Sequence, residues 1–144
     1  MAHGGNFVLD KGFKVLATYN SSAAAGVLEY RAVKVAAGDT IDLVAASSDR
    51  TLGVVQESVD AAKVATGKVV ANVRLLGITK MKVGATPGTI AQGGLVKSDV
   101  DGEAIALGTG SGHIPIGINL TAGTIAAGDL IDVLLTPGLP ALSA

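Results

Sequence analysis

The sequence contains no cysteine and no tryptophan, and its aromatic residues are limited to two phenylalanines and two tyrosines. Without cysteine, the chain can form no disulfide framework, no thiolate metal site and no cysteine nucleophile. Strands usually place aromatic side chains on their pleated faces. A core built by this sequence must therefore consist of small and branched aliphatic side chains.

An excess of one charge and a long hydrophobic run are also missing. The 11 lysines and arginines nearly balance 12 aspartates and glutamates, so the composition predicts no strong attraction to nucleic acid or to a membrane surface. The mean hydropathy of +0.52 is high, yet the longest uncharged stretch, residues 104–128, is interrupted by Gly, Thr, Ser and Pro115. It cannot supply the roughly 20 apolar residues of a membrane span. The first residues lack a basic segment followed by an apolar run, so we expect no signal peptide.

One short phrase occurs three times, as Val35-Ala-Ala-Gly-Asp-Thr-Ile41, Ile90-Ala-Gln-Gly-Gly-Leu-Val96 and Ile125-Ala-Ala-Gly-Asp-Leu-Ile131. Each copy has an apolar residue, then a tight turn on Gly or Gly-Asp, then returning apolar residues. Glycine takes a positive φ at no steric cost, and aspartate can bond back onto the turn backbone. The phrase therefore predicts the start of a β-strand after each turn.

Hydrophobic periodicity favours strands along most of the chain. Residues 68–75 and 79–83 alternate with period two, which places Lys80 and Lys82 on the outward face of their strand. A helix of one or two turns is expected over 58–65, ended by Gly67. Further strands are expected at 13–19, 27–35, 40–46, 52–57, 103–107, 114–119 and 130–135. These elements predict an all-β fold, a compact antiparallel β-sandwich or β-barrel of short strands with at most one short helix.

The aromatic residues are confined to the beginning of this chain, whose 144 residues suggest one domain. We expect an N-terminal arm over 1–30, a β-domain over 31–136 and a C-terminal tail over 137–144. The arm carries all four aromatic residues, which are Phe7, Phe13, Tyr19 and Tyr30. One interpretation is that these side chains anchor a partner, since aromatic residues dominate interface energetics. The other is that the segment forms a first strand that folds back over its own core.

The charges are also segregated along the chain. Residues 61–98 hold six cations and no anion, whereas residues 99–144 hold five anions and no cation. The two signs could form complementary edges between identical subunits. Alternatively, neighbouring strands of one subunit carry opposite signs and pair across the sheet.

None of the chemical motifs forms a convincing catalytic or metal site. Asp99-Val-Asp-Gly-Glu103 resembles the start of a calcium loop, but it lacks the later acidic ligand and predicts a hairpin turn. The pairs Asp39/Asp42 and Asp129/Asp132 are three residues apart, so on a strand they point to opposite faces and are better explained as turn formers. We therefore expect no metal and no cofactor.

Glycine-rich and histidine-containing segments give the same result. Gly108-Thr-Gly-Ser-Gly-His113 has neither nucleotide-loop spacing nor a helix after it, so a loop is the better interpretation. The two histidines, His3 and His113, lie in glycine-rich surroundings, and no nucleophile and base can be paired with either. The sequence predicts no enzyme.

Several short segments, taken in order, resemble a known family. They are residues 35–41, Leu52-Gly-Val-Val55, Leu76-Gly-Ile-Thr-Lys80, residues 90–96, Ile114-Pro-Ile-Gly-Ile118 and Ala127-Gly-Asp-Leu-Ile-Asp-Val-Leu134. Together they are similar to the small capsid cement, or head decoration, proteins of tailed bacteriophages. The resemblance covers about residues 33–136 and leaves out the aromatic arm and the tail.

The resemblance implies a virion protein without catalytic activity. Such proteins bind the outer surface of an assembled capsid, with the major capsid protein as partner, often as homotrimers, and brace the shell against internal DNA pressure. It also implies synthesis in the host cytoplasm, and no direct contact with nucleic acid or membrane. No site residue is carried over from the family. Under this hypothesis Phe7, Phe13, Tyr19 and Tyr30 are the candidate anchoring residues.

A second function class stays open, a β-sandwich binding module of carbohydrate-binding or adhesin type. Such modules usually stack exposed aromatic side chains against sugar rings. The segment after Tyr30 contains no aromatic residue, which argues against this alternative.

Overall fold

The computed structural model describes residues 10–15, 26, 28–36, 40–46, 48–65, 70–109 and 112–136. Within them the fold is all-β, as the sequence predicts, with one short helix, α1 (Ala61–Ala65). The strands are β1 (Asp10–Val15), β2 (Ala32–Val35), β3 (Thr40–Leu43), β4 (Gly53–Val55), β5 (Val70–Arg74), β6 (Gly77–Lys82), β7 (Leu95–Ser98), β8 (Ala104–Ala106), β9 (Gly117–Asn119) and β10 (Leu130–Leu135).

The strand predictions hold for the position of most elements and fail at some ends. Strands β3, β7 and β10 begin at the last two residues of the three copies of the repeated phrase, which is where the sequence predicts a strand to start. The strand expected over 27–35 begins only at Ala32, because Tyr30 takes a left-handed φ of 61° that interrupts extended geometry. The strand expected over 114–119 begins at Gly117, after Pro115, which has no N–H to donate to a neighbouring strand. Residues 16–19 lie outside the described residues.

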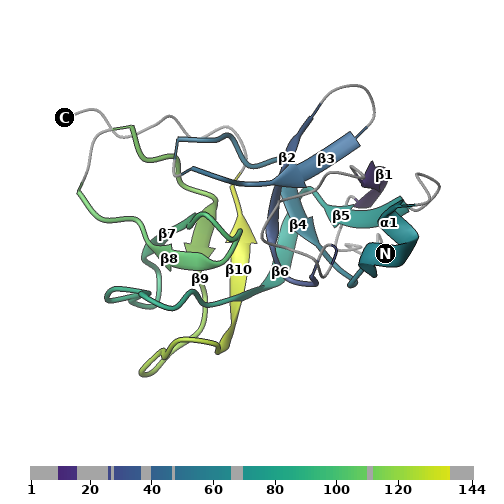
Figure 1. Cartoon of the computed structure of the whole chain (residues 1–144). Helices are drawn as coiled ribbons and strands as arrows, with labels where there is room; N and C mark the ends of the chain where they lie inside the picture. Colours follow the sequence, from purple (N-terminus) through teal and green to yellow (C-terminus); the bar gives the residue numbers. More distant parts are fainter. Residues whose placement is uncertain are drawn as a thin grey trace, which may run out of the picture.

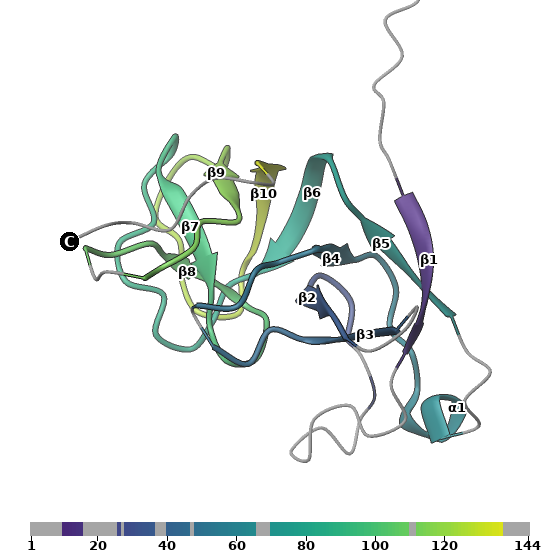
Figure 2. The same cartoon turned by 90° about the horizontal axis from the view of Figure 1, so that it is seen from above.

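The strands form two layers that lie side by side (Figures 1 and 2). One is a closed barrel with the strand order β1-β3-β2-β4-β5, and the other is a five-stranded sheet with the order β6-β10-β9-β7-β8. All strand pairs in the described residues are antiparallel except β1 with β3. The chain passes from the barrel to the sheet between β5 and β6.

The two layers repeat the same topology. We call β1–β5 the first unit and β6–β10 the second unit, because β6 pairs with β10 as β1 pairs with β5, and β7–β10 pair as β2–β5 do. The registers also correspond, since Ile118 pairs with Leu134 as Val54 pairs with Arg74. A parallel bridge between Val83 and Ala104 takes the place of the parallel β1–β3 pairing. The chain is therefore an internal duplication at the level of structure.

Equivalent positions of the two units also share residues. Identical residues occupy the pairs Lys14/Lys82, Val15/Val83, Val33/Val96, Lys34/Lys97, Gly53/Gly117 and Val73/Val133. The thrice-repeated phrase does not mark this duplication. Its copies end in the first two residues of β3, β7 and β10, which are not equivalent strands. The phrase is a recurring way to start a strand, and the duplication is a separate feature.

The described residues form two hydrophobic clusters. The first lies inside the barrel and includes Val33, Ile41, Val55 and Val73, and the second joins the inner face of the second unit to residues of the barrel wall. Strands β2 and β4 contribute to both, because their side chains alternate between the two clusters. Within the described residues, aliphatic side chains and Met81 build these cores, as the scarcity of aromatic residues predicts.

Two equivalent glycines allow close strand contacts. A Cβ on Gly53 would overlap the carbonyl oxygen of Arg74, and a Cβ on Gly117 would overlap the carbonyl oxygen of Leu134. Both belong to segments that carry the resemblance to capsid cement proteins. Each glycine is required because a neighbouring backbone occupies the space of a side chain.

Strand β1 lies within the segment assigned to the N-terminal arm. Its backbone pairs with β3 through Lys14 and Val15, and with β5 over Asp10–Lys14. This is the pairing that the alternative interpretation, a first strand folding back onto its own domain, expects of residues 10–15. The rest of the arm before β1 and the tail over 137–144 lie outside the described residues. No helix of the described part is long and apolar enough to cross a membrane.

Candidate interaction surface

A partly buried ion-pair cluster fixes the junction between the two units. Glu103 Oε1 lies 2.8 Å from Arg31 Nη2 and 3.0 Å from Lys82 Nζ. Arg31 Nη1 also donates to the carbonyl oxygen of Asp101 at 2.8 Å. The side chains of Arg31 and Glu103 are largely buried. Charge-assisted contacts of this kind hold the β7–β8 hairpin against the start of β2.

The predicted hairpin turn at Asp99–Glu103 is confirmed. Asp99 Oδ1 accepts hydrogen bonds from the backbone N–H groups of Asp101 and Glu103, both at 2.9 Å. Gly102 has a φ of 74°, and a Cβ there would lie 2.6 Å from Leu43 Cδ2. Burial raises the pKa of the Asp99 carboxyl above its usual value, against the opposing effect of these hydrogen bonds. The Asp99 carboxylate organises the turn.

Tyr30 lies beside this junction in a strained conformation. A φ of 61° is unusual for a bulky side chain and persists only where the surroundings enforce it. Its N–H donates to Val55 O at 2.8 Å, and its carbonyl oxygen accepts from Lys82 N at 3.2 Å. Both units therefore hold the Tyr30 backbone in place.

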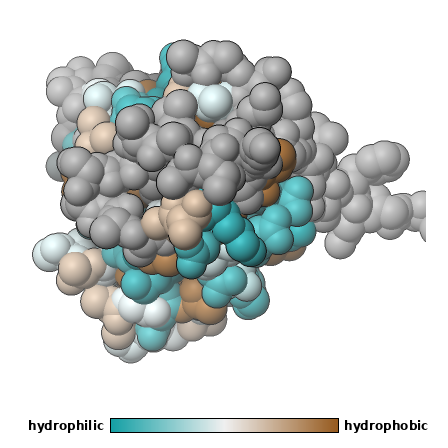
Figure 3. Space-filling view, turned by 45° about the vertical axis from the view of Figure 1, so that its right-hand side comes forward, coloured by the Kyte–Doolittle hydropathy of each residue, from teal (hydrophilic) through white to brown (hydrophobic). Residues whose placement is uncertain are grey.

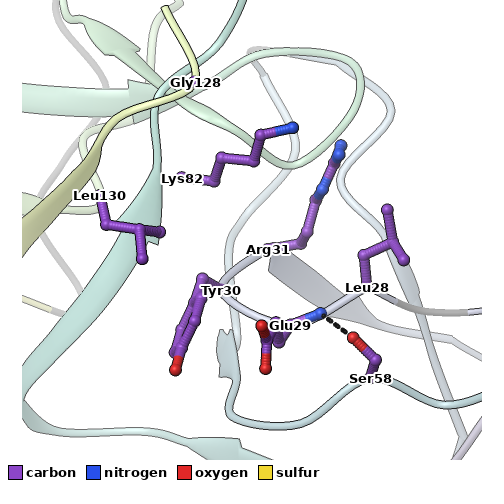
Figure 4. Close-up of a pocket in the computed structure, with 8 residues that line it drawn as sticks. All are labelled: Leu28, Glu29, Tyr30, Arg31, Ser58, Lys82, Gly128 and Leu130. Atoms are coloured by element: carbon purple, nitrogen blue, oxygen red, sulfur yellow. Dashed lines mark hydrogen bonds between the residues drawn. The ribbon is translucent and has the colours of Figure 1, made fainter.

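A groove of about 330 Å³ surrounds Tyr30. Figure 4 shows its lining residues, Leu28, Glu29, Tyr30, Arg31, Ser58, Lys82, Gly128 and Leu130. The Tyr30 ring points away from the cationic ends of Lys82 and Arg31 (Figure 4). Those cations are paired with Glu103, so the groove presents an aromatic ring, the exposed Glu29 and two exposed leucines, Leu28 and Leu130.

The four candidate anchoring residues are described to different extents. Phe7 and Tyr19 lie outside the described residues. The backbone of Phe13 is in β1 opposite Ala71, at the position equivalent to Met81 in the second unit. Of these four residues only Tyr30 has a described side chain, and it lines the groove. The anchoring role of all four stays a prediction.

The outer face of the second unit carries an apolar row across four strands. Ile78 is opposite Leu134, Leu134 is opposite Ile118, and Ile118 is opposite Leu95. We call these four residues the outer row. Ile78, Leu134 and Leu95 are 37–49% exposed, and Ile118 is half-buried. On the face of the molecule drawn in Figure 3, where the barrel side is turned forward, hydrophobic residues also reach the surface among hydrophilic ones.

The same face carries an ion pair next to the outer row. Lys80 of β6 lies opposite Asp132 of β10, with Lys80 Nζ 3.2 Å from Asp132 Oδ1 and both side chains about half exposed. Together with the pair of Lys82 and Glu103, this confirms that the cationic and anionic segments meet within one chain. The outward positions predicted for Lys80 and Lys82 are also confirmed.

An equivalent lysine in each unit has a different partner. In the first unit, Lys34 Nζ lies 2.8 Å from Asp49 Oδ2, and this hydrogen bond lowers the pKa of the Asp49 carboxyl. In the second unit, Lys97 Nζ lies 3.0 Å from His113 Nε2 and 3.1 Å from His113 Nδ1. Lys97 is buried, and this burial lowers its pKa. A carboxylate in one unit is thus replaced by an imidazole in the other.

The remaining polar candidates have structural contacts. Asp129 Oδ2 accepts from the Ala126 N–H at 2.7 Å, which is the turn-forming role predicted for it. His113 Nδ1 lies 3.0 Å from Leu107 O. Within the described part of the chain, no group of three or more His, Cys, Asp or Glu residues could hold a metal ion.

Comparison with known proteins gives an informative structural likeness. No protein-family model and no curated protein matches the sequence. The fold is similar to the crystal structure of the N base of the head fiber protein gp8.5 of bacteriophage phi29, with a TM-score of 0.60. The match covers 90% of this chain and 94% of that chain at 17% sequence identity. At this identity the likeness concerns the fold, which the two chains share over nearly their whole length.

Proposed function

We propose that this chain is a structural protein of a bacteriophage virion that binds the outer surface of the assembled capsid and stabilises it. The observation that carries the proposal is the shared fold with the base of a phage head fiber over 90% of the chain. The ordered segments that resemble capsid cement proteins support it from the sequence side. The proposal includes no catalytic role and no cofactor.

The architecture suits a brace on a capsid. The barrel and the sheet share the β2–β4 wall, whose side chains belong to both hydrophobic clusters. The Arg31–Glu103–Lys82 cluster fixes the junction between them. A rigid body of this kind loses little conformational entropy when it binds, so more of its contact energy contributes to affinity.

The proposed partner is the major capsid protein, bound from outside after synthesis in the host cytoplasm. We propose that the chain acts as a homo-oligomer, with the trimer as the form that the resemblance implies. A capsid offers many identical sites, and an oligomer that engages several at once gains avidity from modest single contacts. The aromatic residues Phe7, Phe13, Tyr19 and Tyr30 are the candidate anchors on the capsid side.

A binding assay with purified phage heads tests this proposal. The full chain is mixed with heads of its phage that lack it, and the heads are then pelleted and examined by electron microscopy. We expect saturable co-pelleting and a regular array of added density, together with greater resistance of the heads to heat. Absence of binding, or binding to glycans without binding to heads, would overturn the proposal.

The role of Tyr30 can be examined in the same assay. Tyr30→Asn removes the aromatic ring, while asparagine tolerates the left-handed conformation of this position better than most residues. If Tyr30 is an anchor, we expect weaker binding to heads at an unchanged urea midpoint. Binding equal to that of the unsubstituted chain would remove Tyr30 from the set of anchors.

A further inference from the structure

We propose that the outer row of the second unit binds a second copy of this chain. The inference deepens the homo-oligomer included in the proposed function, because it assigns a surface to the contact between copies. It rests on the internal duplication, which allows one position of the fold to be compared in two surroundings.

The equivalent position of the first unit is already an interface. Ala32 and Val54 correspond to Leu95 and Ile118 of the outer row, since each pair occupies the same place in the strand registers. Ala32 and Val54 are 0% exposed and belong to the hydrophobic cluster formed with the second unit. Within one chain, this position is therefore the surface on which another unit packs.

In the second unit no described residue covers the same position, yet its side chains are larger and apolar. Leucine stands where the first unit has Ala32, and isoleucine stands where it has Val54. At the two remaining positions, Ile78 and Leu134 replace Asp10 and Arg74. Where the first unit has two charged residues, the second unit exposes aliphatic ones. Contiguous apolar surface of this kind marks an interaction site.

The charges beside the outer row suit a second copy of the same chain. Lys80 and Asp132 lie on adjacent strands and are about half exposed, so the face presents one charge of each sign. A surface that carries both signs side by side can meet an identical or related surface without placing like charges together. A strongly acidic or basic partner would leave one of the two charges facing its own sign.

Measurement of the oligomeric state tests the inference on the full chain. The double variant Ile78→Thr/Leu134→Thr makes the outer row more polar, and threonine has the β-branched shape that strands favour. The matched control is Val35→Thr/Val70→Thr, which changes two exposed valines of the barrel. By sedimentation equilibrium, we expect an oligomer for the unsubstituted chain and the control, and at least about tenfold weaker association for the double variant.

Two results would overturn the inference. One is a monomeric unsubstituted chain at every concentration measured, and the other is a double variant that associates as tightly as the control. A circular dichroism spectrum and a urea midpoint close to those of the control would show that the double variant is folded. If it is not, Leu134→Cys provides the second measurement.

That measurement uses the absence of cysteine from the chain. Leu134→Cys and Val35→Cys each introduce a single thiol at an exposed position, one in the outer row and one outside it. In the native protein we expect the thiol at position 134 to react with a maleimide about tenfold more slowly than the thiol at position 35. Equal rates would contradict a covered outer row.

The head-binding assay separates this inference from the proposed function. A double variant that keeps its oligomeric mass but loses binding to heads would show that the row contacts the capsid, which overturns the inference and leaves the proposed function standing. An oligomer that depends on the outer row but does not bind heads would contradict the proposed function and support the inference.

Discussion

The first and second units share strand order and register, but they differ in what covers their outer faces. In the first unit the outer face of β2 and β4 is buried by the second unit, whereas in the second unit no described residue covers the equivalent face. If a second copy covers the outer row, as we propose, residue choice at a given place in the strand register follows the neighbour that covers it. Equivalent substitutions in the two units can therefore distinguish residues that stabilise the fold from residues that serve a surface contact.

The largest effect is expected where the two units are most alike, at Gly53 and Gly117. Alanine at either position would place a Cβ against the carbonyl oxygen of the adjacent strand, so we expect Gly53→Ala and Gly117→Ala each to cost about 3 kcal/mol or more in the free energy of unfolding. Urea denaturation measures both. If one of the two variants is as stable as the unsubstituted chain, the close strand contact is not common to the two units.

A smaller loss is expected at the junction between the units. Glu103→Gln leaves the largely buried guanidinium of Arg31 without its carboxylate partner, and we expect a cost of about 2–3 kcal/mol in the free energy of unfolding. Asp132→Asn is the matched control, because it removes the carboxylate of the exposed pair with Lys80 and should cost less than about 1 kcal/mol. Equal costs would mean that the junction pair is no stronger than the surface pair.

The same substitution at equivalent positions should have unequal effects. Val54→Thr places a hydroxyl in the cluster between the units, and we expect it to destabilise the chain by about 2 kcal/mol. Ile118→Thr alters the half-buried member of the outer row and should cost about 1 kcal/mol or less in the monomer. If the cost at Ile118 reaches that at Val54 in dilute, monomeric protein, the outer row is part of the core of a single chain.

The smallest changes in stability are expected at the equivalent lysines, Lys34 and Lys97, and they should differ in sign. Lys34→Met removes the partner of Asp49 and should destabilise the chain by about 1 kcal/mol near neutral pH. Lys97→Met removes a buried ammonium group whose pKa is lowered by desolvation, so we expect unchanged or slightly increased stability. Thermal denaturation of the two variants tests this, and a larger loss for Lys97→Met would contradict it.

The pH dependence follows from the same contacts. Lys34 holds the pKa of Asp49 below the usual 3.8, so the stability contributed by Asp49 is present above that value and is lost as the pH falls through the lowered pKa. Lys34→Met should therefore weaken the acid-side loss of stability, measured as urea midpoints below about pH 4. If the urea midpoints of the variant fall with decreasing pH as steeply as those of the unsubstituted chain, the Lys34–Asp49 pair contributes little to stability.

The sequence predicts much of the fold because its strands are short and are separated by recognisable glycine-containing turns. Alternation over β5 and β6 correctly assigns Ala71, Val73, Thr79 and Met81 to buried positions. Strand β7 follows from the Gly93–Gly94 turn. The start of β2 is missed, because the left-handed φ of Tyr30 is imposed by hydrogen bonds to Val55 and Lys82 from distant segments.

The duplication and the outer row were not predicted. The shared residues of the two units, such as Gly53/Gly117 and Lys34/Lys97, are too few to stand out until the strand registers align them. The outer row is composed of residues from four strands that become neighbours only in the folded sheet. Alternation identifies the two faces of a strand, but it does not reveal that apolar residues on the outward faces of separate strands lie in one line.

Electron cryomicroscopy of phage heads saturated with the full chain would test capsid decoration most directly. We predict density for the β-fold on the outer surface of the shell, in contact with the major capsid protein and with the outer row covered by a neighbouring copy. Heads that show no added density on their outer surface under saturating conditions would contradict the proposed function.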